Sequence, residues 1–74
     1  MSHTPIAKGT YRHFKGMMYR VLDEVRHSET LETYVLYETL YENKLGKLWI
    51  RPLSMFTEIV EHNGQRVPRF TRVE

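Results

Sequence analysis

Histidine and carboxylate side chains are the groups in this chain whose chemistry is most easily named. His27 and Glu29 lie two residues apart in a polar segment, and His13 stands earlier in the chain. An imidazole titrates near neutral pH and a nearby carboxylate fixes its tautomer, so such groups can bind a divalent cation or transfer a proton. With Arg51 as an anion-binding group, they define one hypothesis, a small-molecule or enzymatic pocket built on His13, His27, Glu29 and Arg51.

The spacing of these residues does not by itself specify a site. His13 and His27 fall in different predicted strands, so only the fold can bring them together. A turn in which Ser28, Glu29 and Thr30 hydrogen-bond local amides is the simpler explanation of the second segment. The chain has no Cys and no glycine-rich phosphate loop, which removes thiol nucleophiles and P-loop chemistry. We predict no metal and no cofactor, and leave open whether the protein is an enzyme.

A second set of candidates is aromatic and cationic. Trp49, the only Trp of the chain, and Arg51 lie two residues apart in a run that breaks at Pro52, so on a strand they share a face. Aromatic rings stack on bases or proline rings, and a guanidinium holds phosphate or carboxylate. Tyr11 and Tyr41 are further aromatic candidates for this binding surface. We predict a binding groove lined by Tyr19, Tyr37, Trp49 and Arg51, with His27 and Glu29 at its rim.

The competing explanation is that these rings form the core. A chain of 74 residues buries only about 60% of the surface that its unfolded form exposes, so it needs its large rings for burial. Trp49 fits either role, whereas we expect Tyr37 and Tyr41 to be at least partly exposed. If Trp49 is buried, Arg51 is either a paired, partly buried cation or the polar lip of a pocket.

Short β-strands must position these side chains. Tyr, Val, Ile, Thr, Phe and Trp are frequent from residue 10 onward, and apolar residues recur with a period of two. Leu22 and Asp23 are out of phase and predict a bulge, Asn63-Gly64 predicts a type I′ hairpin turn, and Pro68 predicts an edge strand. The predicted strands are 10–15, 18–26, 33–41, 48–51, 59–62 and 65–70, with one helical turn within 53–57.

These elements predict an all-β fold, a small partly open SH3-like barrel of five or six antiparallel strands with one short helical turn. A curled sheet with one helix is the alternative architecture. Residues 1–8 are expected to form a flexible N-terminal tail, and residues 9–74 a single β-barrel domain. Because the domain is small and has no disulfide, association into a homodimer is one way for it to gain buried surface.

The net charge and the hydropathy of the chain exclude few classes of binding partner. Eleven basic and nine acidic residues give a formal net charge of +2, a faint preference for nucleic acid. No run approaches the roughly 18 apolar residues of a membrane span, and the first eight residues lack the apolar run of a signal peptide. We expect no association with membranes and a cytoplasmic location, which the absence of Cys suits.

Several motifs occur in an order that resembles a known family. They are Gly9-x-Tyr11-x-His13-Phe14-Lys15-Gly16, Tyr19-x-Val21, Arg26-His27-Ser28-Glu29-Thr30-x-Glu32, Tyr37-x-x-Leu40-Tyr41 and Trp49-x-Arg51-Pro52-x-x-x-Phe56, followed by Asn63-Gly64 and the stretch 67–70. Through them the chain resembles the small uncharacterised bacterial proteins grouped as domain of unknown function 1653. The resemblance implies one compact, mostly β, bacterial domain of cytoplasmic habit, and it brings no reaction, ligand or cofactor.

Two functional hypotheses follow from these observations. The leading one is a non-enzymatic binding module that holds nucleic acid or a peptide in the groove lined by aromatic rings and Arg51. The alternative is the small-molecule or enzymatic pocket centred on the histidines. The two differ in a structural consequence, because the second requires His13 and His27 to converge.

Overall fold

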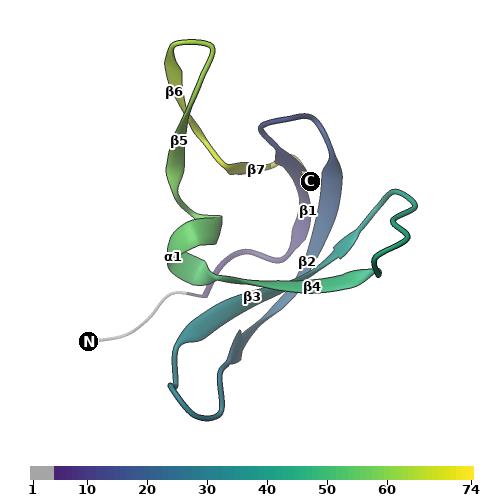
Figure 1. The fold of residues 1–74 in the computed structure, drawn as a ribbon, viewed down its shortest axis with the longest axis vertical. Helices are drawn as coiled ribbons and strands as arrows, with labels where there is room; N and C mark the ends of the chain where they lie inside the picture. Colours follow the sequence, from purple (N-terminus) through teal and green to yellow (C-terminus); the bar gives the residue numbers. More distant parts are fainter. Residues whose placement is uncertain (1–4) are drawn as a thin grey trace.

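The computed structural model describes residues 5–74, which form seven strands and one short helix (Figure 1). In chain order the elements are β1 (Gly9–His13), β2 (Met18–Arg26), β3 (Thr33–Thr39), β4 (Leu48–Pro52), α1 (Leu53–Phe56), β5 (Ile59–His62), β6 (Gln65–Pro68) and β7 (Phe70–Arg72).

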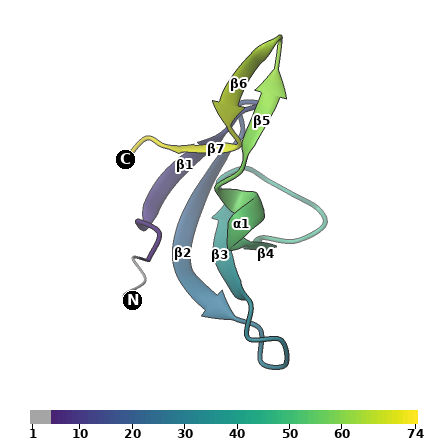
Figure 2. The ribbon, with the colours of Figure 1, turned by 90° about the vertical axis from the view of Figure 1, so that its left-hand side faces the viewer.

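Five of the strands form one antiparallel sheet in the order β4-β3-β2-β1-β7, and β5 and β6 form a separate hairpin. The helix α1 follows β4 directly at Pro52 and packs against β3 and β4 (Figure 2). We call the sheet face that α1 covers the inner face. Thr57 ends the helix, and its hydroxyl donates to the Leu53 carbonyl oxygen at 2.9 Å.

The all-β class and the predicted helical turn are confirmed, and the strands form open sheets that do not close into a barrel. The edges β4 and β7 do not pair with each other, and α1 lies beside the space between them (Figure 1). Seven strands form instead of five or six because the run 65–70 divides at Arg69. There the Arg69 N–H donates to the Glu58 carbonyl, and the Arg69 carbonyl accepts from the Phe14 N–H.

Three local predictions are confirmed. The register between β2 and β3 shifts between Val21 and Asp23, where the bulge was expected. Asn63 and Gly64 both have positive φ, 54° and 76°, as a type I′ turn requires. Pro68 lies in β6, which pairs with β5 alone and is therefore an edge strand that needs no further donor.

The core lies between the inner face and α1. Its buried apolar side chains are Tyr11, Val21, Val35, Tyr37, Phe56 and Phe70. Tyr37 is only 5% exposed, so the expectation that it would be partly exposed was wrong. The reason is that β3 turns Val35, Tyr37 and Thr39 inward, where the Tyr37 ring lies 5.5 Å from that of Phe56.

Part of the segment expected to be a flexible tail lies against the fold. The Tyr11 hydroxyl donates to the Ala7 carbonyl at 2.6 Å, and Arg72 Nε donates to the Lys8 carbonyl at 3.1 Å. Ile6 packs against the core. Residues 1–4 of the expected tail lie outside the described residues. Residues 5–74 contain no helix long and apolar enough to cross a membrane.

Candidate functional site

A depression of about 190 Å³ opens on the inner face where β2, β3 and β4 meet the loop after β3. Five of its seven residues come from β2, β3 and the loop after β3, and two come from β4. We call it the aromatic depression, and its lining consists of Tyr19, Tyr37, Thr39, Tyr41, Asn43, Trp49 and Arg51.

The register of the sheet places these side chains together. Tyr37 lies directly opposite Trp49 across the β3–β4 ladder, and Tyr19 lies opposite Thr39 across the β2–β3 ladder. Residues directly opposite each other in antiparallel strands point to the same face. The partly buried Trp49 ring is held by its indole N–H, which donates to the Gly46 carbonyl at 3.1 Å.

Two phenols form a hydrogen-bonded pair at one side of the depression. The hydroxyl oxygens of Tyr19 and Tyr41 are 2.9 Å apart, and their rings meet edge to face. Burial, and after it the hydrogen bond to Tyr41, raises the pKa of Tyr19 above its usual value of 10.0. The Tyr19 phenol is therefore neutral at physiological pH and adds no negative charge to the depression.

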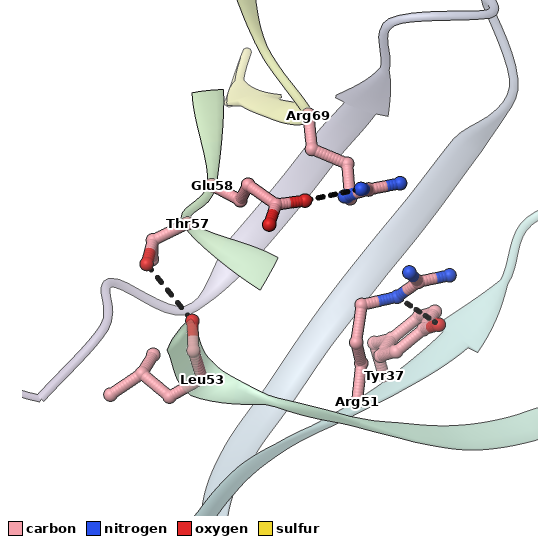
Figure 3. A network of polar contacts seen from close by, with 6 residues as sticks. All are labelled: Tyr37, Arg51, Leu53, Thr57, Glu58 and Arg69. Atoms are coloured by element: carbon pink, nitrogen blue, oxygen red, sulfur yellow. Dashed lines mark hydrogen bonds and ion pairs between the residues drawn. The ribbon is translucent and has the colours of Figure 1, made fainter. Parts of the chain in front are cut away.

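Arg51 provides the cation of the depression. This half-buried side chain donates from Nε to the Tyr37 hydroxyl at 3.5 Å (Figure 3), and its guanidinium carbon lies 5.8 Å from the centre of the Phe70 ring. No Asp or Glu belongs to the lining. Among the described residues the ion pairs are Arg20–Glu38, Lys47–Glu38 and Arg69–Glu58, so Arg51 has no carboxylate partner there.

The structure brings together four of the six residues predicted for the groove, Tyr19, Tyr37, Trp49 and Arg51. It does not bring His27 and Glu29 to the rim. They lie in the turn after β2, at the opposite end of this strand from Tyr19. A nine-residue strand spans about 25–30 Å, so they are too far away to reach a ligand in the depression.

The side chains of the turn that contains His27 form hydrogen bonds with backbone amides of the same turn. His27 Nδ1 accepts the N–H groups of Glu29 at 3.1 Å and Thr30 at 3.3 Å, and the Thr30 hydroxyl accepts the Glu32 N–H at 3.2 Å. These side chains bond backbone amides in the way that favours a structural turn over a catalytic pair.

The alternative pocket of His13, His27, Glu29 and Arg51 is therefore not assembled. His13 ends β1 beside the start of β2, whereas His27 follows the end of β2. Among residues 5–74, no group of three or more His, Asp or Glu side chains is arranged to hold a metal ion. His13 instead packs edge to face against Phe70 and Tyr19.

The comparisons with known proteins identify the family. A family model described as a protein of unknown function, DUF1653, matches residues 9–72. This chain belongs to the DUF1653 family. A crystal structure of a DUF1653 protein from Bordetella bronchiseptica is similar to it, with 35% sequence identity, coverage of 92% of this chain and 87% of that chain, and a TM-score of 0.88. No curated protein matches the chain.

Membership of DUF1653 confirms the family that the ordered motifs predicted, and the description of the family assigns no activity. Sequence reasoning missed Thr39 and Asn43 as parts of this depression and did not place Tyr41 in the groove. Tyr41 could have been placed there from its spacing, because residues four apart on a strand, such as Tyr37 and Tyr41, point to the same face. Asn43 lies in a loop and accepts the Leu45 N–H at 2.9 Å, a feature that strand alternation cannot predict.

The histidine beside this site makes stability depend on pH. Burial, and after it the positive charges of Arg51, Arg69 and Lys15, lowers the pKa of His13 below 6.5. As the pH falls through about 6.5, the unfolded chain therefore binds more protons than the folded one. The contribution of neutral His13 to the free energy of unfolding is complete above that pH and is lost below it. We expect the free energy of unfolding to fall between pH 7.5 and 5.5, and to fall less steeply in His13→Gln. Urea denaturation of both proteins at several pH values measures this dependence. If the free energy of unfolding changed with pH equally in the two proteins, the prediction would be contradicted.

Proposed function

We propose that this protein is a non-enzymatic binding module that holds a segment of nucleic acid or a peptide in the aromatic depression. The observation that carries the proposal is that Tyr19 of β2, with Trp49 and Arg51 of β4, lines one depression together with the buried Tyr37 of β3. Ring faces for stacking and a guanidinium for anionic oxygens are the groups that such ligands need.

The size of the depression suits part of a polymer. Its volume of about 190 Å³ is below the roughly 300–1,000 Å³ of sites that enclose a drug-sized molecule. One base or one side chain fits such a volume, and the rest of a longer ligand then continues across the surface. A catalytic pocket has less support, because the residues that would perform acid–base chemistry lie at opposite ends of β2.

Fluorescence provides the test, since Trp49 is the only Trp of the chain and lies in the site. We expect a saturable change in its emission with at least one of three ligands, single-stranded RNA, single-stranded DNA or a peptide pool. Tyr41→Ala should weaken binding by about tenfold or more, because one stacking contact contributes roughly 1–3 kcal/mol.

A control variant comes from the same strand as Trp49. Ile50 lies between Trp49 and Arg51, points to the other face of the sheet and is 54% exposed, so Ile50→Ala should leave the affinity unchanged. The proposal fails if none of the three ligands changes the emission of the folded protein, or if Ile50→Ala weakens binding as much as Tyr41→Ala.

A further inference from the structure

Positive charge around the aromatic depression is not balanced by the residues that line it. None of the seven is acidic, and Arg51 is the one cation among them. Its Nε donates to Tyr37, while its two terminal nitrogens make no hydrogen bond within the described part of the chain. A half-buried guanidinium with free N–H groups can donate two parallel hydrogen bonds to the oxygens of an anionic group.

A second arginine extends over the same face. Figure 3 shows the Arg51 side chain rising from β4 and the Arg69 side chain descending from the segment before β7. Arg69 forms an ion pair with Glu58, yet its Nε is buried without a partner. Both guanidinium charges contribute to the lowered pKa of His13, so both act on the same region of the inner face.

The aromatic side chains beside these cations are neutral and flat. The Tyr19 phenol is held in its protonated form, and the hydroxyl pair of Tyr19 and Tyr41 offers hydrogen bonds without adding charge. The partly buried Trp49 completes the lining on the β4 side. A ligand that fits this environment carries a planar ring next to an anionic group.

We propose that the ligand is single-stranded nucleic acid, with one base stacked in the aromatic depression and an adjacent phosphate held by Arg51, with Arg69 as a second cation nearby. This inference rests on the proposed function and selects between its two ligand classes. In a polynucleotide every flat ring is joined to a phosphate, whereas a peptide combines a ring and an anion only in particular sequences. The strand must be single because a base in a duplex is stacked and paired and cannot enter a depression of this size.

The test measures the affinity of the full chain for an eight-residue oligothymidylate through Trp49 fluorescence. Arg51→Gln should raise the dissociation constant by about tenfold, because it removes one charge-assisted contact. It should also make the slope of log affinity against log salt less negative by about 0.7, the value for one phosphate contact on a single strand. Arg20→Gln is the matched control. Arg20 lies on the opposite face of β2 and pairs with Glu38, so both quantities should stay as in the unaltered protein.

The outcomes separate this inference from the proposed function. Binding of the peptide pool without binding of single-stranded DNA or RNA would overturn the inference and leave the proposed function standing, and binding of none of the three would overturn both. Equal effects of Arg51→Gln and Arg20→Gln, or equal affinity for the same sequence as a duplex, would also contradict the inference. If Arg51→Gln does not fold, the salt dependence of the unaltered protein decides, and an affinity that does not change with salt would overturn the inference.

Discussion

Phe56→Ala should remove about 3–5 kcal/mol from the free energy of unfolding, the usual cost of deleting a fully buried Phe ring. Phe56 is 1% exposed and its ring stacks on that of Phe70, with centres 4.0 Å apart and planes 3° from parallel. It also contacts the Tyr11 ring at 5.5 Å and the Tyr37 ring at 5.5 Å. A domain of this size is stable by roughly 5–10 kcal/mol, so this one change removes a large part of the total.

The neighbouring residue supplies the control for this prediction. Met55 precedes Phe56 in α1 and is 42% exposed, so Met55→Ala should cost less than about 1 kcal/mol. Urea denaturation followed by circular dichroism measures both variants. Equal losses in the two would show that the ring stack does not hold α1 on the inner face, and would remove the basis for placing the core there.

Gly9→Ala should destabilise the domain by about 2 kcal/mol or more and release the end of the chain from β1. Gly9 has φ of 132°, and a Cβ there would overlap the backbone carbonyl oxygen of Glu74. That oxygen accepts the Thr10 N–H at 3.0 Å, and the Thr10 carbonyl accepts the Val73 N–H at 2.9 Å. Positive φ alone costs a residue with a side chain roughly 1–2 kcal/mol, and the overlap adds to it. The Val73 amide should exchange with solvent faster in the variant.

A second glycine separates the two causes. Gly64 also has positive φ, 76°, but no atom lies within 4 Å of the position where its Cβ would be. Gly64→Ala should therefore cost only the conformational part, roughly 1–2 kcal/mol. If Gly9→Ala costs no more than Gly64→Ala, the docking of the chain end against β1 does not contribute to stability as described.

Local backbone chemistry explains which parts of the fold were predictable. Strand alternation, the turn at Asn63-Gly64 and the bulge after Val21 depend on residues adjacent in sequence, and all three predictions are confirmed. Closure of the sheet depends on contacts between distant segments. The chain turns at Arg69 because its backbone bonds Glu58 on one side and Phe14 on the other, and neither bond leaves a signal in the local sequence.

The same distinction applies to the candidate site. Trp49 and Arg51 share a strand face by parity, and antiparallel pairing adds Tyr37 from the next strand, so these residues meet as predicted. The position of His27 depended on which end of β2 the groove would occupy, which alternation does not reveal. Both faces of β3 carry apolar residues, and Tyr37 is buried because its ring packs against Phe56 of α1 and Phe70 of β7, which are distant in the sequence.

The most direct test of the central claim is an amide and indole NMR spectrum recorded while the eight-residue oligothymidylate is added. We expect the largest shifts at the Trp49 indole N–H and at the amides of Tyr41 and Asn43, which line the aromatic depression. Shifts concentrated at Leu48 and Ile50 on the outer face, which are 60% and 54% exposed, with the Trp49 indole unmoved, would contradict the account and place the binding site elsewhere.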